Sequence, residues 1–408
     1  MTKRRFIIID DDRVTGGHAR ALLTRAGHDV TVFQSSPEGY AAIRANPPDA
    51  VVTDVMMPDM DGMELTQKLR SDRAFDDMRI FVFSGKAFEY DRRRALELGA
   101  DAYILKPIKA DIFLETVERV LDDKVAVDFW GVRGTLPRPG PESLKYGGNT
   151  NCVALTFPRG QHFIFDAGSG IRSVADRLLR GGKTRSEGKI FISHPHWDHI
   201  NALPFFTPLY IPGNDYEILG PTHGSMGIER LVSAQMDGAY FPITVREFGA
   251  RVTYRDLREG TYDVAGISVK TMLLSHPGYC LGYRVDYHGR SVCYITDNEM
   301  FLPESDYHAP DYMDNLSDFV RGTDLLVTDS TYTDAEYRSK VGWGHSCLSQ
   351  VVELACRAEV KTLCLYHHDP DQDDAAIDAK LAAAQELIAA RGGPVTCIAP
   401  AEGDCIRL

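Results

Sequence analysis

The first 151 residues contain no cysteine, and the whole sequence has only eight. All eight stand at or after position 152, and none belongs to a Cys-x-x-Cys pair. The opening Met1-Thr2-Lys3-Arg4-Arg5 leads into an apolar run that is too short for a signal peptide. These absences argue against a disulfide-bonded secreted protein and predict a reduced, cytoplasmic protein with no membrane partner.

Positive charge is also scarce, because 45 Lys and Arg stand against 58 Asp and Glu, a formal net charge of -13. A broad nucleic-acid platform needs the opposite balance, so extended nucleic acid is not expected as a partner. The remaining composition is ordinary globular usage, with 44% hydrophobic and 25% charged residues. A length of 408 residues exceeds one core and predicts two domains.

Histidine is unevenly distributed, with only His18 and His28 in the first 122 residues and eleven beyond them. The densest stretch is His194-Pro195-His196-Trp197-Asp198-His199, shortly after the apolar run 190–192. Alternate residues of an extended turn point the same way, so His194 and His196 can bind one ion while Asp198 and His199 face a second. The stretch therefore predicts a site for two metal ions at the end of a strand.

Such a cluster cannot complete two coordination spheres alone, so further ligands are expected at the ends of other strands. Three apolar runs end in suitable side chains: 272–274 before Ser275-His276, 292–295 before Thr296-Asp297, and 363–365 before Tyr366-His367-His368. Each repeats the pattern of a buried strand followed by a polar ligand.

These motifs, with Asp166 in Phe165-Asp166-Ala167-Gly168, resemble those of the metallo-β-lactamase superfamily over about residues 127–408. The resemblance implies that one ion is held by His194, His196 and His276, a second by Asp198, His199 and His367, and that Asp297 bridges both. His368 stays open as an alternative to His367. Zinc is the metal most expected, but His and Asp ligands also serve iron and manganese.

The segment Gly344-His345-Ser346 resembles the corresponding element of ribonuclease Z and of related cyclic-phosphate phosphodiesterases. That resemblance implies that His345 protonates the leaving oxygen, while Asp198 orients the attacking water as well as binding metal. The alternative is that His345 only begins a helix, with Ser346 as its cap. The aromatic residues after the histidine cluster, Phe205, Phe206 and Tyr210, either stack on a planar group of the substrate or pack in the core.

The first 122 residues have a different pattern, in which four apolar runs each end in a polar residue. These are 6–9 before Asp10-Asp11-Asp12, 50–53 before Asp54, 80–83 before Ser84, and 102–105 before Lys106. The carboxyl ends of parallel strands meet at one edge of a doubly wound sheet, which is where such sheets bind ligands. A gathered set of carboxylates there predicts a cation.

This arrangement resembles the receiver domain of response regulators. The resemblance implies that Asp54 accepts a phosphoryl group from a cognate sensor histidine kinase or phosphotransfer protein. It also implies that Asp10 and Asp11 hold Mg²⁺, that Ser84 is the switch hydroxyl, and that Lys106 contacts the phosphoryl oxygens. Tyr103 is either the switch aromatic or a packing residue.

The predicted fold class is α/β in both domains. We expect a doubly wound, flavodoxin-like receiver at 1–122, with helices near 15–26, 37–45, 63–69, 90–98 and 111–121, a short linker at 123–126, and an αββα metallo-β-lactamase sandwich at 127–408.

The combined interpretation is a response regulator whose output is a dinuclear metal-dependent hydrolase. A phosphodiesterase acting on a small phosphodiester and regulated through Asp54 is the first hypothesis. A thiolester or lactone hydrolase, a non-hydrolytic di-iron sensor of oxygen or redox state, and an inactive domain that only binds a partner are the alternatives. A homodimer is possible, and the sequence leaves the direction of regulation open.

Overall fold

The computed structural model describes residues 3–85, 88–180 and 185–408. The chain divides into two compact units, one of Met1–Val125 with Phe157–Gly160 and one of Ala126–Thr156 with Gln161–Leu408. Each unit has its own sheets and core and is described by itself. No helix in the described part of the chain is both long enough and apolar enough to cross a membrane.

The first unit is built on a parallel sheet in the strand order β2-β1-β3-β4-β5. Its strands are β1 (Arg5–Ile9), β2 (Asp29–Phe33), β3 (Ala50–Asp54), β4 (Arg79–Ser84) and β5 (Ala102–Leu105). The inner strands are almost wholly buried because helices cover both faces of the sheet. The expected doubly wound fold is confirmed.

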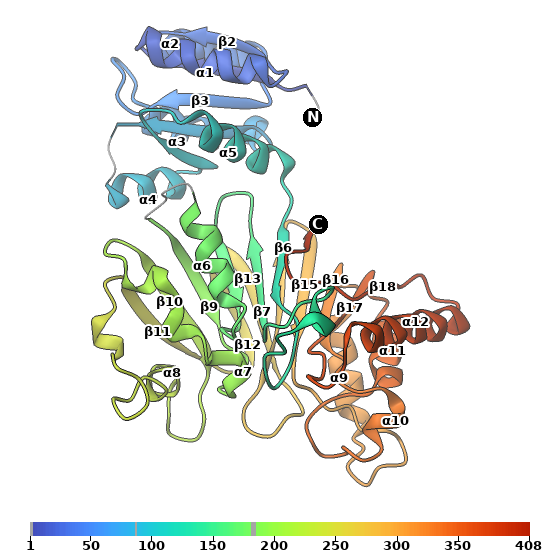
Figure 1. Cartoon of the computed structure of the whole chain (residues 1–408). Coiled ribbons are helices and arrows are strands. Elements are labelled where there is room, and N and C mark those ends of the chain that lie inside the picture. Colours follow the sequence, from blue (N-terminus) through green and yellow to red (C-terminus); the bar gives the residue numbers. More distant parts are fainter. Residues whose placement is uncertain (1–2, 86–87, 181–184) are drawn as a thin grey trace. The chain divides into compact units, whose positions relative to one another are not determined.

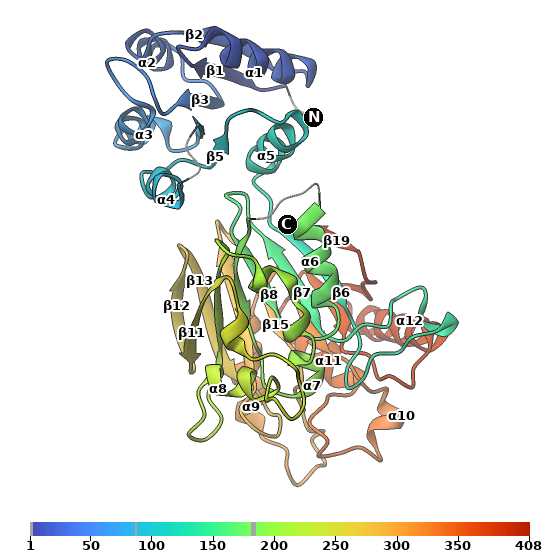
Figure 2. The ribbon, with the colours of Figure 1, turned by 60° about the vertical axis from the view of Figure 1, so that its left-hand side comes forward.

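Helices α1 and α5 pack on one face of this sheet, and α2, α3 and α4 pack on the other (Figure 2). They span α1 (Arg13–Arg25), α2 (Ser36–Ala45), α3 (Gly62–Arg70), α4 (Glu89–Glu97) and α5 (Ala110–Asp122), with a short 3₁₀ turn η1 (Arg73–Phe75). Asp12 begins α1 by accepting hydrogen bonds from the amides of Val14 and Thr15. The third residue of the acidic run is therefore used as a helix cap.

The sequence predicted four strands of this sheet and missed the fifth, β2. It lies at the edge of the sheet, where its residues alternate between exposed and half-buried positions. A strand in this position carries no continuous apolar run, which is the signal that identified the other four.

The second unit contains two seven-stranded sheets. The first has the order β11-β10-β9-β8-β7-β6-β19 and consists of β6 (Ala126–Gly131), β7 (Cys152–Thr156), β8 (His162–Phe165), β9 (Glu187–Phe191), β10 (Asp215–Pro221), β11 (Arg251–Leu257) and β19 (Cys405–Arg407). The second runs in sequence order through β12 (Gly260–Val264), β13 (Ile267–Leu273), β14 (Leu281–Tyr287), β15 (Arg290–Ile295), β16 (Leu325–Asp329), β17 (Thr362–Tyr366) and β18 (Thr396–Ile398).

Aromatic side chains from both sheets meet in the interior of this sandwich. Phe165 of β8 stacks on Phe191 of β9 at 5.0 Å between ring centroids, and both lie within 5.5 Å of Tyr283 from the other sheet. Because side chains alternate along a strand, the neighbours Ile164 and Ile190 point outward into a separate aliphatic cluster. Strands β8 and β9 are therefore buried on both faces of the first sheet.

Helices cover the outer faces and complete the four layers (Figure 1). Helix α6 (Ile171–Leu179) packs on the first sheet, and α9 (Pro310–Val320), α11 (Leu348–Arg357) and α12 (Asp374–Arg391) cover the second. Shorter elements lie in the connections: α7 (Trp197–Ile200), α8 (Ile228–Ala234), α10 (Asp334–Tyr337), η2 (Pro141–Ser143), η4 (Leu203–Phe205), η5 (Thr207–Tyr210) and η6 (Val245–Glu247). The expected αββα sandwich is confirmed.

Candidate metal centre

The predicted metal ligands of the second unit lie in turns that follow strands β9, β13, β15 and β17, and in the short helix α7. The structure brings all of them together in two groups that share one carboxylate. The seven residues are His194, His196, Asp198, His199, His276, Asp297 and His367.

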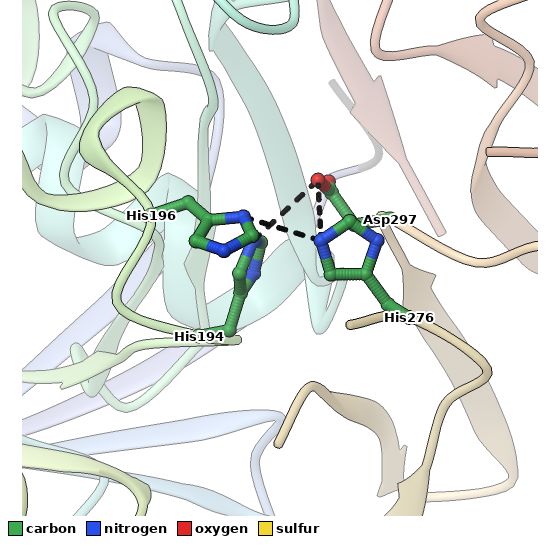
Figure 3. A group of neighbouring side chains, drawn as sticks. All are labelled: His194, His196, His276 and Asp297. Carbon is green, nitrogen blue, oxygen red and sulfur yellow. Dashed lines mark hydrogen bonds and ion pairs between the residues drawn. The ribbon is translucent and has the colours of Figure 1, made fainter. Parts of the chain in front are cut away.

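The first group is formed by three imidazoles and Asp297, whose polar atoms turn toward one another (Figure 3). Asp297 Oδ2 lies 3.5 Å from His194 Nε2 and 3.7 Å from His276 Nε2. His276 Nε2 is also 3.2 Å from His196 Nδ1. One ligand atom of each residue lies within 4.8 Å of the others, a span that one coordinated ion can bridge.

The second group uses the other oxygen of the shared carboxylate. Asp297 Oδ1 lies 3.1 Å from His199 Nε2 and 3.0 Å from His367 Nε2. Asp198 Oδ2 lies 3.1 Å and 3.3 Å from the same two nitrogens. Asp297 thus presents one oxygen to each group, which is the position required of a bridging ligand.

Asp166 orients His199 from outside the group. Its carboxylate accepts hydrogen bonds from His199 Nδ1 at 2.7 Å and from the Tyr294 hydroxyl at 2.8 Å. It also accepts two from the backbone amide and hydroxyl of Ser193, the residue before the cluster. The proton of His199 therefore sits on Nδ1, which leaves Nε2 free to bind metal.

His276 and His367 are held in the same tautomer by different acceptors. His276 Nδ1 donates to the carbonyl of Gly344 at 2.9 Å. His367 Nδ1 lies 2.9 Å from the hydroxyl of Thr331, which donates its own proton to Asp329 at 2.6 Å and so accepts from the imidazole. In both residues Nε2 is the nitrogen that faces the group.

The segment before β7 supports the second group from its backbone. A Cβ at Gly134 would lie 2.1 Å from Cε1 of His367, so only glycine fits beside that ring. The amide of Thr135 donates to Asp198 at 2.8 Å from a residue with φ of 63°. A β-branched residue rarely adopts that conformation, so the backbone is strained where it touches the ligand.

The two groups differ in their electrostatics. Burial lowers the pKa of His194, His196 and His276, and neighbouring imidazoles lower it further. Burial acts in the same direction on the other two rings, but Asp198 and Asp297 outweigh it, raising the pKa of His199 and bringing the pKa of His367 to about 10. The first group is therefore a set of neutral imidazoles, and the second is rich in carboxylate.

These donor sets fit divalent metal ions. His194 is 1% exposed, and within the described residues its Nε2 has no hydrogen-bond partner, which is costly for a buried polar atom unless a ligand completes it. Imidazole nitrogens and carboxylate oxygens at such spacing are the ligands that zinc, iron and manganese share.

His345 lies beside the metal centre, where its ring centroid is 4.9 Å from that of His367 and 5.4 Å from that of His276. Its Nδ1 lies 2.9 Å from Oδ2 of Asp329, the last residue of β16. Burial disfavours the charged imidazole, but Asp329 and then Asp297 outweigh it and hold the pKa of His345 above its usual value. This arrangement suits a proton donor.

The loop that carries His345 is fastened to the turn that carries Asp297. Glu299 is buried and accepts hydrogen bonds from the amides of Gly342 and Gly344, each at 2.7 Å, and from the Tyr337 hydroxyl. Ser346 donates to the carbonyl of Asn298 in the same turn. His345 and Asp297 are therefore positioned by one local network.

The first unit has a smaller acidic site at the carboxyl edge of its sheet, where Asp10, Asp11 and Asp54 lie within reach of one ion. Lys106 Nζ is 3.1 Å from both Asp10 and Asp54. Burial raises the pKa of Asp54 and Asp10, and hydrogen bonds from Lys106 oppose the rise.

Ser84 is buried at the end of β4 in the same unit. Burial raises the pKa of Tyr103, and a hydrogen bond with Ser84 opposes that rise. The structure therefore joins the two residues that the sequence named as switch candidates.

Comparison with protein families assigns both units. The model of the response regulator receiver domain matches residues 6–118, and that of the beta-lactamase superfamily domain matches residues 161–368, more than half of the chain. The chain belongs to the beta-lactamase superfamily. This superfamily member also carries a receiver domain, so both family expectations are confirmed. Its metallo-β-lactamase fold implies divalent metal binding, and its receiver implies a phosphodonor such as a histidine kinase.

Relatives resemble parts of this superfamily member. Response regulator MprA of Mycobacterium sp. (strain KMS) is 35% identical over 139 residues, 34% of this chain and 55% of that protein, so the match spans about half of the relative. The metallo-beta-lactamase fold protein YhfI from Bacillus subtilis has a TM-score of 0.49 and 16% identity, covering 70% of this chain and 100% of that chain. Human tRNase Z, short form, has a TM-score of 0.46 and 21% identity over 69% of this chain and 98% of that chain.

One residue of the site was missed by the sequence interpretation, and two alternatives that it left open can be compared with the structure. His367 and not His368 reaches the second group, and His368 is buried with neither ring nitrogen hydrogen-bonded within the described residues. Phe206 packs in the core against Tyr216, which removes it from the stacking candidates. Asp329 was missed, although Leu325-Leu326-Val327-Thr328-Asp329 repeats the pattern of a buried strand ending in a carboxylate.

Proposed function

We propose that this protein is a response regulator in which phosphorylation of Asp54 controls a dinuclear metal-dependent phosphodiesterase in the second unit. The observation that carries the proposal is the His345–Asp329 pair beside two ligand groups that share Asp297. Hydrolysis of a phosphodiester needs a nucleophilic water and a proton for the leaving alkoxide, and this site offers groups for both.

The seven ligands would hold two divalent ions, which supply an acidified water and neutralise charge on the phosphoryl oxygens. Asp297 would contribute one oxygen to each ion. Asp198 also faces the reaction, since its Oδ2 accepts from the Thr135 amide at 2.8 Å and from Asn151 Nδ2 at 3.2 Å. These donors hold the carboxylate in one orientation, from which it can direct a proton of the water.

His345 would protonate the leaving oxygen. Its Nδ1 is occupied by Asp329, so Nε2 is the nitrogen available to the substrate. Asp329 is fully buried and accepts two further hydrogen bonds from Thr331. These contacts fix its carboxylate, which in turn keeps the imidazole of His345 in place. The raised pKa of His345 favours the protonated ring, which is the form that a general acid requires.

In the receiver, Asp54 would attack a phosphoryl group from a sensor histidine kinase or phosphotransfer protein. Asp10 and Asp11 would hold Mg²⁺, which neutralises the gathered carboxylates, and Lys106 would contact the phosphoryl oxygens. Ser84 and Tyr103 would then change position together, because they are hydrogen-bonded.

The test is turnover of full-length protein loaded with zinc, manganese or iron. Bis-p-nitrophenyl phosphate, 2′,3′-cyclic nucleotides, a thiolester and a lactone are offered to the same preparation, and released product is measured. We expect hydrolysis of the phosphodiesters and loss of that activity with a chelator. Turnover confined to the thiolester or lactone would overturn the phosphodiesterase assignment, and a redox-active di-iron centre with no turnover of any substrate would replace it with a sensor.

A further inference from the structure

The second unit contains a cavity of about 410 Å³ next to the segment that follows the histidine cluster. One wall is the first half of α6, and another is formed by η4 and η5. Phe241 and Ile243, from the connection between α8 and β11, close a third side. The cavity is of the size at which small-molecule sites begin.

Aromatic rings form one corner of this cavity. Phe205 and Phe241 meet edge to face, with 5.4 Å between ring centroids and an interplanar angle of 89°. Phe205 remains 54% exposed, so a ligand can reach its ring. Tyr210 is held in the wall because its hydroxyl donates to the carbonyl of Pro204 at 2.7 Å. The corner therefore presents a fixed ring surface to a ligand.

Polar groups line the other side. Arg172 and Asp176 stand four residues apart on α6 and so share one face of the helix, and Thr207 lies across from them on η5. Within the described ranges none of these three side chains forms a hydrogen bond or ion pair. A cation, a carboxylate and a hydroxyl are thus available beside the aromatic corner.

Both polar and aromatic walls begin at turns that contact the ligand-bearing helix α7. Gly168, just before α6, packs so closely on Asp198 that a Cβ would lie 2.2 Å from its carbonyl oxygen. Ala167 donates to the carbonyl of His199 at 2.7 Å, and η4 starts at Leu203, four residues beyond that ligand. The walls of the cavity therefore continue, within a few residues of the chain, from the turns that contact helix α7.

We propose that this cavity binds the base of a small nucleotide substrate. The inference rests on the proposed phosphodiesterase function. The cavity would hold the base, which is the part of the substrate that does not react. A planar base stacks on Phe205, with the perpendicular ring of Phe241 closing the corner, while its edge exchanges hydrogen bonds with Arg172, Asp176 and Thr207. The aromatic wall then contacts the face of the base, and the polar wall contacts its edge.

An alkyl or acyl chain matches this cavity less well. It would cover the Arg172 and Asp176 charges without pairing them, which costs free energy. A second cavity of about 300 Å³, lined by Leu273, Met300, Phe301, Tyr307 and other mainly apolar residues, is the better place for such a chain. Of these two cavities, the one lined by Arg172 and Asp176 suits a base better.

The experiment compares adenosine 5′-monophosphate and guanosine 5′-monophosphate with ribose 5-phosphate, which lacks only the base. Binding to metal-loaded full-length protein is measured by calorimetry, so the readout does not depend on turnover. We expect the nucleotides to bind about 5- to 150-fold more tightly than ribose 5-phosphate, the range that stacking of one base supplies. Phe205→Ala and Arg172→Ala should each reduce this ratio while leaving the affinity for ribose 5-phosphate unchanged.

Matched variants separate a local effect from damage to the fold. Phe205→Trp keeps a stacking surface and should preserve the ratio, and Tyr307→Ala removes an exposed aromatic from the other cavity and should also preserve it. Equal binding of nucleotides and ribose 5-phosphate by the wild type would overturn the inference. A base-dependent ratio that Phe205→Ala and Arg172→Ala leave intact would overturn it too, since the base would bind elsewhere.

Hydrolysis of bis-p-nitrophenyl phosphate, assayed in parallel, distinguishes the two proposals. Turnover without any base-dependent binding would reject the nucleotide cavity and keep the phosphodiesterase. Base-dependent binding that falls in Phe205→Ala, from a protein that hydrolyses no phosphodiester, would keep the cavity and reject the phosphodiesterase.

Discussion

The acidic site of the receiver and the metal centre of the second unit both gather carboxylates at the ends of buried strands, but they balance the charge differently. In the receiver, Lys106 lies 3.1 Å from both Asp10 and Asp54. In the metal centre, the ligand groups consist of imidazoles and carboxylates, and the nearby Lys380 donates instead to the carbonyl of Ser330 and to Gln372. The receiver thus sets a lysine against its carboxylates, whereas in the metal centre the carboxylates face imidazoles.

This difference explains the choice of ligands. Oxygen ligands and a resident lysine would suit a hard, exchangeable ion such as Mg²⁺. Imidazoles held by Asp166, Gly344 and Thr331 suit a borderline metal that stays in place.

The largest expected effect comes from removing the shared carboxylate. Asp297→Ala should lose bound metal and phosphodiester hydrolysis together, because each ligand group loses one of its oxygens. Metal content by mass spectrometry and turnover are measured on the same sample. Asp10→Ala is the matched control in the receiver and should keep the full metal content of the second unit. Full metal content in Asp297→Ala would contradict the assignment of Asp297 as a ligand.

Removal of the proposed proton donor should be the next largest effect. His345→Ala is expected to keep its metals and to lose turnover by about 10² to 10⁴, the usual contribution of one general acid. Because the pKa of His345 is raised, the wild type should lose activity as the pH rises through that value, and the variant should lack this alkaline limb.

Asp329→Asn tests the origin of the raised pKa. Without the carboxylate the imidazolium is less stable, so the alkaline limb should move to lower pH while metal content stays unchanged. For the His345→Ala variant of the preceding prediction, loss of metal would show that His345 is a metal ligand and not the proton donor.

Coupling between the units should produce a smaller change. Beryllofluoride with Mg²⁺ is expected to alter turnover of the wild type about 5- to 150-fold, the range of ordinary allosteric coupling energies, and to leave Asp54→Ala unchanged. Steady-state hydrolysis is measured with and without the phosphoryl analogue. Equal turnover, with binding at Asp54 established, would mean that the receiver controls location or assembly and not catalysis.

Lys380 and Lys106 should differ in how they make the free energy of unfolding depend on pH. Burial lowers the pKa of Lys380 to about 7, whereas Asp10 and Asp54 outweigh burial and raise the pKa of Lys106. Between about 7 and its usual value of 10.5, Lys380 takes up a proton only when the chain unfolds, so stability should rise with pH in that window. The slope should approach about 1.4 kcal/mol per pH unit.

Urea denaturation at several pH values measures this slope. Lys380→Met should reduce it, and the exposed control Lys361→Met should retain it. Identical slopes in the wild type and Lys380→Met would show that the amine is charged in the folded protein.

The sequence was most informative where a buried strand ends in a reactive side chain. Every predicted ligand group and the receiver's acidic site obey that local rule, and the structure brings their members together. Edge strand β2 escaped because exposure interrupts its apolar run. Asp329 obeys the same rule, but nothing in the sequence shows that it meets His345. Glu299 escaped because its value depends on hydrogen bonds from the amides of Gly342 and Gly344, which approach only in the folded chain.

The aromatic corner of the cavity shows the same limit. Phe205 follows the histidine cluster and was a candidate from the sequence, whereas Phe241 comes from an irregular connection that no periodicity identifies. Which of the three aromatic candidates is exposed was also undetermined, because apolar residues beside a site serve packing and binding equally well.

The pairing of β19 with β6 has a consequence for synthesis. Cys405–Arg407 closes the first sheet beside Ala126–Asp128, and Glu402 holds the Asn149 loop behind the metal centre. The receiver draws its sheet from residues 5–105 and can form while the ribosome is still making the rest. Each new chain is therefore expected to be able to take a phosphoryl group before it can hold metal, and a chain ended ahead of β19 should remain in that early state.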